Sequence, residues 1–246
     1  MSLPVHLVPS LAGVVVGDEV TVEGDEAHHA VAVRRLRVGE QVVLTDGAGA
    51  SVTAAVASTG KRIFAATVLD RHDVPEPAPA FTVVQALPKG ERGELAVEVL
   101  TEIGAGRLVP WAAARSVAVW KGERAEKSVA RWRATAREAA KQARRAWFPD
   151  VAPLAGTAEV AALIEHAALA VVLHEEGSES LAAVTLPEQG DIVVVVGPEG
   201  GLTDEEIAAF EASGATTVKL GSEVLRTSTA GVAALAALLA RTARWG

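Results

Sequence analysis

The spacing of apolar and polar residues divides the chain into two regions of different character. In the first region, short apolar stretches are separated by glycine and aspartate, a spacing typical of a small β-barrel. These stretches occupy residues 13–22, 39–56 and 61–70. The segment DVPEPAPA (73–80) follows, and its three prolines cannot donate backbone hydrogen bonds to a sheet. We therefore predict a β-barrel domain over 1–72, a proline-rich linker over 73–80 and a second domain over 81–246.

Beyond the linker, near-continuous apolar stretches alternate with helical patterns. We expect strands at 81–87, near 107–113, within 168–176 (ending near Leu173), at 191–197 and at 216–221. We expect helices at 91–105, at about 124–146 and at 229–243. Buried strands that alternate with helices predict an α/β fold, with a parallel sheet covered by helices on both faces.

Composition narrows the class of protein. Of the 246 residues, 50% are hydrophobic and none is cysteine, which excludes disulfides, thiolate metal sites and cysteine nucleophiles. No apolar run reaches the length of a membrane span, and the first ten residues lack the features of a signal peptide, so we expect a cytoplasmic protein. The six histidines show no metal-ligand spacing, and we expect no metal.

Charge is distributed unevenly along the chain. The net charge is −8, yet residues 115–145 hold ten lysines or arginines and only three glutamates. Such a basic block in an acidic protein indicates a site for a polyanion. Four of its residues recur at helical spacing and predict one basic stripe, although a solvated helix face is the ordinary interpretation: Arg133, Arg137, Lys141 and Arg144. A second basic group, Arg34, Arg35 and Arg37, follows two histidines and suggests contact with an RNA backbone.

The segment GPEGGLTDEEI (197–207) follows the most apolar predicted strand. Its glycines suit a sharp bend or a close approach to a ligand, and Thr203 with Glu206 forms a capping box that begins a helix. Neither the P-loop pattern nor the dinucleotide-binding pattern is present, and Glu199 would repel a triphosphate. A tight turn without a ligand is the simpler interpretation of this loop alone. If it binds a ligand, that ligand is neutral or positive near Glu199.

Two further loops also follow predicted parallel strands. The segment KLGSEVLRTSTAG (219–231) contains a glycine loop and Arg226, whose position on a loop is not required by packing. The segment LHEE (173–176) ends a third strand. Since ligands of open α/β sheets bind at the carboxyl ends of strands, we expect the three loops to enclose one small ligand.

Several ordered motifs resemble one known family. The segments GPEGGLTDEEI and LGSEVLRTSTA are similar to those of SPOUT-class methyltransferases, and more narrowly of the RsmE family of ribosomal RNA small-subunit methyltransferases. The resemblance covers nearly the whole chain. It extends to HHAVAVRRLRVGEQVVLTDG, LPKGERGELAVEVLTEIGAGRLVP, ARSVAVW, EAAKQARRAWFP and LHEE.

The resemblance implies a PUA-like RNA-binding barrel, a SPOUT domain with a C-terminal trefoil knot, and a homodimer. It also implies S-adenosylmethionine as cofactor and N3 of a uridine in 16S rRNA, uracil 1498, as the methylated atom. By the same resemblance, the cofactor contacts are Leu173, His174, Gly197, Pro198, Glu199, Gly200, Gly201, Leu220, Gly221, Leu225 and Arg226. The family commonly has glutamate where this chain has Ser228, so that a role of this acid would pass to Glu223.

The chemistry adds one catalytic candidate. Uracil N3 is weakly acidic, so a cation near its carbonyls would stabilise the developing anion, and we expect Arg226 or an arginine of the basic helix to supply that charge. N3 lies on the pairing edge, which requires an unpaired or extruded base. Two alternatives remain open: ribose 2′-O-methylation by the same class of enzyme, and a non-catalytic RNA-binding or ribosome-assembly factor.

Overall fold

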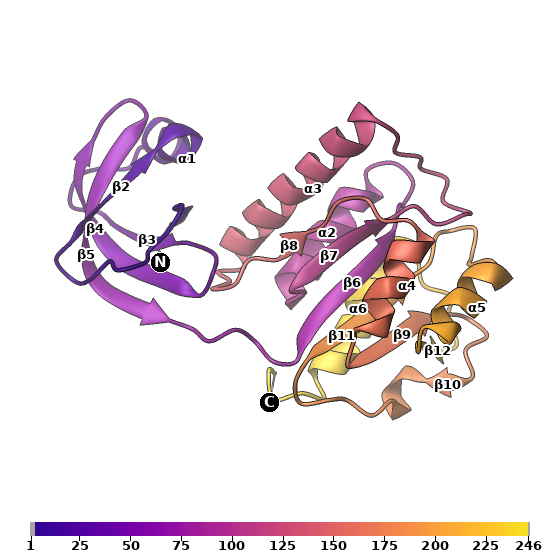
Figure 1. The fold of residues 1–246 in the computed structure, drawn as a ribbon. Helices are drawn as coiled ribbons and strands as arrows, with labels where there is room; N and C mark the ends of the chain where they lie inside the picture. Colours follow the sequence, from indigo (N-terminus) through magenta and orange to yellow (C-terminus); the bar gives the residue numbers. More distant parts are fainter. Residues whose placement is uncertain (1–2, 246) are drawn as a thin grey trace. The chain divides into compact units, whose positions relative to one another are not determined.

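A computed structural model describes residues 3–245 of the chain, which form two compact units (Figure 1). The first unit comprises the described residues of Met1–Glu76 together with Lys141–Phe148. The second comprises Pro77–Ala140 and the described residues of Pro149–Gly246. The first unit is therefore built from two stretches that are far apart in the sequence.

The first unit is a curled five-stranded sheet. Its strands are β1 (Val5–Leu7), β2 (Glu19–Glu23), β3 (Gln41–Thr45), β4 (Ala50–Thr59) and β5 (Ile63–Asp73), in the order β1-β3-β4-β5-β2. The register between β4 and β5 shifts twice, at Thr53/Ala54 and at Val56/Ser58, and such irregularities bend a sheet. Because β1 and β2 remain edge strands, the predicted barrel is a half-barrel. The arginine-rich segment follows helix α1 (Gly24–His28) and the π-helical turn η1 (His29–Val33).

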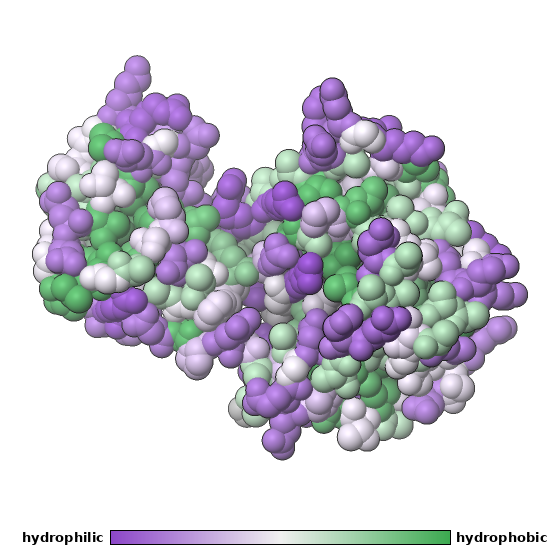
Figure 2. Space-filling model, in the orientation of Figure 1, coloured by the Kyte–Doolittle hydropathy of each residue, from purple (hydrophilic) through white to green (hydrophobic). Residues whose placement is uncertain are grey.

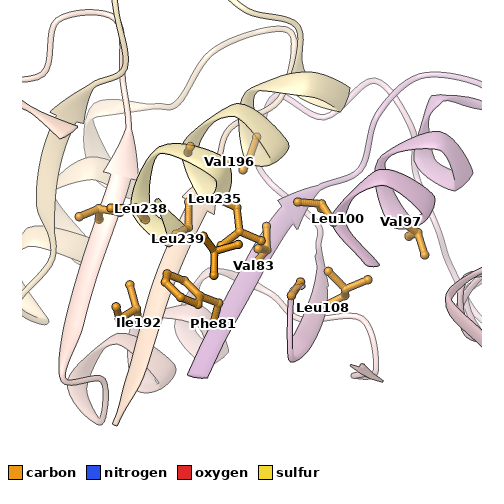
Figure 3. Packing of buried hydrophobic residues seen from close by; sticks show 14 of the residues in the cluster. Phe81, Val83, Val97, Leu100, Leu108, Ile192, Val196, Leu235, Leu238 and Leu239 are labelled. Carbon is orange, nitrogen blue, oxygen red and sulfur yellow. The ribbon is translucent and has the colours of Figure 1, made fainter. Parts of the chain in front are cut away.

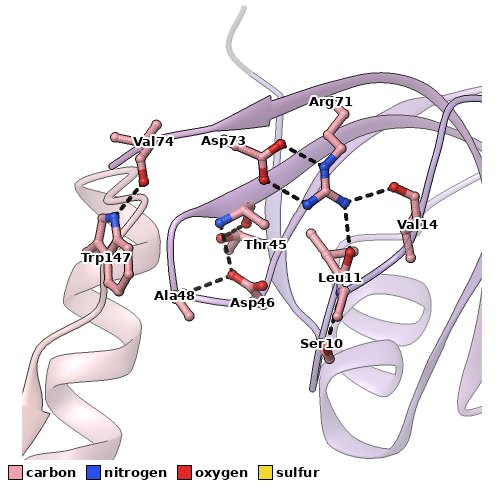
Figure 4. A network of polar contacts seen from close by, with 12 residues as sticks. Ser10, Leu11, Val14, Thr45, Asp46, Ala48, Arg71, Asp73, Val74 and Trp147 are labelled. Atoms are coloured by element: carbon pink, nitrogen blue, oxygen red, sulfur yellow. Dashed lines mark hydrogen bonds and ion pairs between the residues drawn. The ribbon is translucent and has the colours of Figure 1, made fainter. Parts of the chain in front are cut away.

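Arg71 fixes the loop between β1 and β2 to strand β5 (Figure 4). Its Nη1 donates to the carbonyls of Leu11 at 2.7 Å and Val14 at 2.8 Å. Its Nε and Nη2 pair with both carboxylate oxygens of Asp73, at 2.8 and 2.7 Å. One guanidinium thus joins two parts of the unit, the β1–β2 loop and strand β5, an arrangement that suits the fixed fork geometry of arginine.

The stretch Lys141–Phe148 packs closely against the strands of the first unit. The indole Nε1 of Trp147 donates to the Val74 carbonyl at 2.8 Å (Figure 4). A Cβ placed on Gly49 would lie 2.7 Å from the Trp147 ring, so that only glycine fits there. The local sequence pattern gives no sign of this association.

The second unit contains a parallel sheet, as predicted, but it has seven strands, and the two-residue strands β8 and β10 were not predicted. Its strands are β6 (Ala80–Ala86), β7 (Arg107–Trp111), β8 (Asp150–Val151), β9 (Leu169–Leu173), β10 (Glu179–Ser180), β11 (Asp191–Val196) and β12 (Thr216–Lys219). They lie in the order β10-β12-β9-β11-β6-β7-β8, and every pairing is parallel. The trefoil knot stays a prediction.

Helices cover both faces of this sheet, as the apolar strands predicted. They are α2 (Arg92–Ile103), α3 (Glu123–Gln142), α4 (Thr157–Glu165), α5 (Asp204–Ala212), α6 (Thr227–Leu239) and the short η2 (Leu181–Ala183). Ile192, Val194 and Val196 belong to the hydrophobic cluster that includes residues of α2 and α6, and Figure 3 shows Ile192 and Val196 within it. Val193 and Val195 belong to the cluster that includes residues of α4 and α5. The sequence pattern did not predict α4, a short helix with only Val160 and Ile164 fully buried.

The basic helix is shorter than predicted. It ends at Gln142 instead of residue 146, and Arg144 has a φ of 55°. The left-handed backbone at Arg144 is incompatible with a continuing α-helix. Arg144 therefore lies outside the helical stripe that the spacing of basic residues predicted.

No helix in the described part of the chain is long and apolar enough to cross a membrane. On the face shown in Figure 2, hydrophobic patches are interrupted by polar residues over both units. Large apolar side chains that are exposed include Val15, Val16, Val117, Val119 and Val224.

A charged cluster joins three segments of the first unit. Lys141 Nζ lies 2.8 Å from Glu26 Oε1, and His6 Nδ1 lies 3.1 Å from the same oxygen. Burial alone would raise the pKa of Glu26, but hydrogen bonds and the charges of His6 and Lys141 lower it to about 2, from an ordinary value of 4.5. The carboxylate form is therefore favoured by the fold.

We expect this cluster to make stability depend on pH. Because the folded pKa is depressed, its contribution is complete above pH 4.5 and is lost as the pH falls through about 2. The shift corresponds to at most about 3 kcal/mol, which partial exposure to solvent reduces to roughly 1–2 kcal/mol. Urea unfolding between these pH values should show that loss in the wild type and a flatter profile in Glu26→Gln. The exposed neighbour Asp25, paired with Arg62, gives a matched control, since Asp25→Asn should keep the wild-type profile. Identical profiles for Glu26→Gln and the wild type would contradict the assignment.

Candidate functional site

A pocket of about 960 Å³ opens at the carboxyl ends of β9, β11 and β12. This is the edge where ligands of open parallel sheets bind. All eleven residues predicted as cofactor contacts line it, from Leu173 at the end of β9 to Arg226 before α6. The structure thus brings together three loops that lie far apart in the sequence, as expected from parallel strands.

The loop after β11 forms one wall, and its glycines have different structural reasons. Gly201 has a φ of 73°, a conformation that favours glycine. Gly200 has ordinary backbone but no space, since an added Cβ would lie 2.9 Å from the Arg115 carbonyl oxygen. Gly197 faces Leu202, whose Cγ would be 3.2 Å from an added Cβ. The loop is therefore packed closely against the residues around it.

The predicted capping box starts α5 and also secures a neighbouring loop. Thr203 Oγ1 accepts the N–H of Glu206 at 3.2 Å, and Glu206 Oε2 accepts the N–H of Thr203 at 3.0 Å. The other carboxylate oxygen of Glu206 accepts the N–H of Ala114 at 2.8 Å. This buried glutamate thereby joins the loop after β7 to the loop after β11.

Arg115 is a pocket residue that the sequence reasoning missed. It follows β7, and its Nη1 donates to the Leu202 carbonyl at 3.0 Å. The missed signal was its position: an arginine four residues beyond a parallel strand lies near the ligand-binding edge of the sheet.

Another wall of the pocket consists of residues 219–226 and the first turn of α6. Arg226 is the N-cap of α6, and its carbonyl accepts the N–H groups of Thr229 and Ala230, each at 2.9 Å. The Arg226 side chain is exposed and makes no hydrogen bond or ion pair with any described residue. Ser228 lies inside the first turn of the helix, is 3% exposed, and its Oγ has no partner within residues 3–245. Glu223, the alternative acid, lines the pocket.

Charged groups around the pocket favour a ligand with positive charge. Five carboxylates line it: Glu175, Glu176, Glu199, Asp204 and Glu223. Three cations accompany them: Arg115, Lys219 and Arg226. Glu199 Oε1 accepts the N–H of Lys89 at 3.2 Å, which orients this carboxylate in the loop. Such a lining suits a sulfonium or ammonium group more than a polyphosphate.

The residues predicted to contact RNA lie in two places, in the segment after η1 and on or beyond helix α3. Arg34, Arg35 and Arg37 are exposed, and Leu36 between them is buried. On α3, Arg133 and Arg137 are both exposed; Arg133 Nε donates to the Val151 carbonyl at 2.9 Å, and Arg137 lies beside Glu138.

Lys141 is the least accessible of these cations. Its ion pair with Glu26 leaves its side chain 12% exposed, whereas Arg144 is exposed beyond the end of the helix. The four predicted positions therefore do not form a uniform solvent-facing stripe.

Within residues 3–245, no group of three or more metal-ligating side chains is present.

Family models match both parts of the sequence. A model described as an RNA methyltransferase domain matches residues 75–239, and one described as an RNA methyltransferase PUA domain matches residues 22–69. The Mycobacterium tuberculosis protein named ribosomal RNA small subunit methyltransferase E is 46% identical, over 93% of this chain and 89% of its own. The Bacillus subtilis protein of the same name is 30% identical, over 90% of each chain.

Solved structures agree with these relatives. The Neisseria gonorrhoeae ribosomal RNA small subunit methyltransferase E, described as bound to S-adenosyl methionine, aligns with a TM-score of 0.87. It is 28% identical, and the alignment covers 98% of each chain. A putative methyltransferase from Legionella pneumophila, described as in complex with SAM, aligns with a TM-score of 0.88 at 25% identity, over 98% of this chain and 99% of its own.

Proposed function

The chain belongs to the ribosomal RNA small subunit methyltransferase E family, and we propose that it transfers a methyl group from S-adenosylmethionine to N3 of one uridine of 16S rRNA. The observation that carries this proposal is the convergence of three strand-end loops on one acid-lined pocket. By the resemblance, the uridine is at position 1498. Activity on the small ribosomal subunit would place the protein in the cytoplasm.

The pocket residues fit S-adenosylmethionine, which supplies an electrophilic methyl group on a positively charged sulfur. The five carboxylates would hold its positive groups, and the glycine loop after β11 would form one wall of its site. Arg115 and Lys219 are the cations available for its carboxylate. We assign the eleven predicted contacts, from Leu173 to Arg226, to this cofactor.

Arg226 would act on the uracil. As N3 loses its proton, negative charge spreads over the two neighbouring carbonyl oxygens, and a guanidinium beside them stabilises this anion. The exposed side chain of Arg226 has no competing ion pair in the described structure and lies at the pocket. The chain has no cysteine for a covalent adduct at carbon 5, which favours a ring nitrogen as acceptor.

The decisive experiment is mass mapping of 16S rRNA from cells with and without this protein. The wild-type gene should restore one methyl group on uracil N3, whereas the gene for Arg226→Ala should not. In vitro, we expect Arg226→Ala to lower turnover by about 10²- to 10³-fold, the usual effect of removing a group that stabilises an anionic transition state. Arg226→Lys, which keeps the charge, should retain more activity. Full activity of a folded Arg226→Ala would reject the catalytic role, and a methyl group on a ribose oxygen would reject the N3 assignment.

We further propose that the half-barrel and the basic segment bind the RNA. The exposed cations best placed for phosphates are Arg34, Arg35, Arg37, Arg137 and Arg144. Lys141, paired with Glu26, serves mainly to hold the first unit together. Binding by these groups would release counterions, so the affinity should fall steeply with salt.

Arg34→Gln combined with Arg37→Gln should therefore flatten the salt dependence. Two lost phosphate contacts would reduce the slope of log affinity against log salt by about 1.4. Filter binding with an rRNA fragment at several salt concentrations measures the slope. Arg107→Gln is the control, because Arg107 begins β7 at the opposite end of the sheet from the pocket. An unchanged slope in the double variant would remove these arginines from the RNA site.

We also propose that two chains form a homodimer, as the resemblance implies. Helix α6 packs on α2 and the sheet of its own chain, so its apolar character alone does not require a partner. Support comes from the pocket rim, where Val224 is 78% and Leu225 41% exposed. Sedimentation equilibrium should give a mass twice the 25.3 kDa of one chain. A monomer at micromolar concentration would contradict the proposal.

A further inference from the structure

A glutamine is buried within the hydrophobic face that carries α6. Gln85 lies on β6, beside Val196 of β11, and is 1% exposed. Its neighbours on the same face of the strand, Val83 and Leu87, belong to the hydrophobic cluster. A buried amide must find hydrogen-bond partners or lose free energy, so this position calls for a reason other than packing.

The amide of Gln85 joins two distant segments. Its Nε2 donates to the Ala86 carbonyl at 3.1 Å and to the Thr227 carbonyl at 3.2 Å. Both neighbours are acceptors, which fixes the nitrogen end of the amide toward them. Thr227 is the first residue of α6, 142 positions along the chain from Gln85.

The contact holds α6 near a point where the helix approaches the sheet closely. A Cβ placed on Gly231 would lie 3.2 Å from Val196 Cγ2, 3.3 Å from Leu100 Cδ2 and 3.6 Å from Gln85 Oε1. Gly231, directly after the first turn of the helix, therefore fits closely against Val196, Leu100 and Gln85. The hydrogen bond to Thr227 sets the position of this turn along the strand.

We propose that Gln85 is a positioning residue for methyl transfer, acting through the start of α6. The proposal rests on the function given above. Thr227 directly follows Arg226, and the Arg226 carbonyl is itself bonded into the first turn of the helix. Gln85 does not line the pocket, so it can act only through this turn. Displacing the turn moves the Arg226 guanidinium relative to the uracil.

The first test replaces the amide with an apolar side chain of the same length. Gln85→Met should lower kcat by about 10- to 100-fold, the effect expected of an ångström-scale displacement of a catalytic group. The affinity for S-adenosylmethionine, measured by calorimetry, should fall much less than kcat. The same samples are checked by circular dichroism, so that kcat refers to folded protein. A wild-type kcat in folded Gln85→Met would overturn the proposal.

A matched control lies on the same strand. Thr82 is also buried, and its Oγ1 donates one hydrogen bond to Asp191 at 2.8 Å, at the end of the sheet away from the pocket. Thr82→Val should lower stability but leave kcat and KM unchanged. If Thr82→Val lowers kcat as much as Gln85→Met does, loss of stability explains both and the proposal fails.

A second variant gives a readout that simple packing would not move. In Gln85→Glu, the carboxylate faces two carbonyls and cannot donate, whereas the protonated acid can donate to Thr227. Burial raises the pKa of the new carboxyl toward neutrality. The ratio of its kcat to that of the wild type should therefore rise as the pH is lowered from about 8 to about 6. A ratio that stays constant, with the variant folded throughout, would contradict the assignment.

These outcomes are separable from failure of the proposed function. If the wild-type protein does not methylate 16S rRNA, the proposed function fails before any variant is compared. If the wild type is active and both Gln85 variants behave like it, only the role of Gln85 fails.

Discussion

Burial of the parallel sheet on both faces is the constraint on which the second unit depends. With helices on each face, the sheet is accessible only at the ends of its strands, and parallel pairing places all carboxyl ends on one edge. The loops after β9, β11 and β12 therefore meet, although about fifty residues separate Leu173 from Arg226 in the sequence. The pocket is a consequence of the pairing order, and the loop residues decide which ligand fits it.

Local pattern therefore predicted the parallel sheet of the second unit and the short strands of the first, but not the contacts between segments that are distant in the sequence. The runs of valine gave the strands, and the parallel arrangement then placed the eleven predicted contacts around one pocket. In contrast, the association of residues 141–148 with the half-barrel depends on Glu26, which is 115 positions from its partner Lys141. The early end of α3 depends on the backbone at Arg144. The periodicity of apolar residues reflects burial within one helix or strand. Contacts between segments that are distant in the sequence therefore cannot be predicted from it.

The pocket offers a physical reason for the uneven distribution of charge along the chain. A sulfonium donor is attracted by carboxylates, whereas an RNA acceptor is attracted by arginine and lysine. A surface of one sign would repel one of the two reactants. The carboxylates lie on the strand-end loops, whereas ten of the 23 lysines and arginines lie between 115 and 145, so the two charges are concentrated in different segments. The net charge of −8 therefore does not argue against an RNA substrate.

Two buried polar side chains help to fix the geometry around the pocket. Glu206 on α5 accepts from Ala114 and Thr203 and so joins two strand-end loops, whereas Gln85 on β6 donates to Thr227 and so joins the start of α6 to the sheet. An apolar side chain could fill either space, but it would not define one position along the helix or strand, because dispersion contacts have little directional preference. A hydrogen bond does define one position, because a buried donor or acceptor that loses its partner costs free energy. The hydrogen bonds of Glu206 and Gln85 therefore contribute a defined geometry to the loops and to the start of α6, which apolar packing alone would not give.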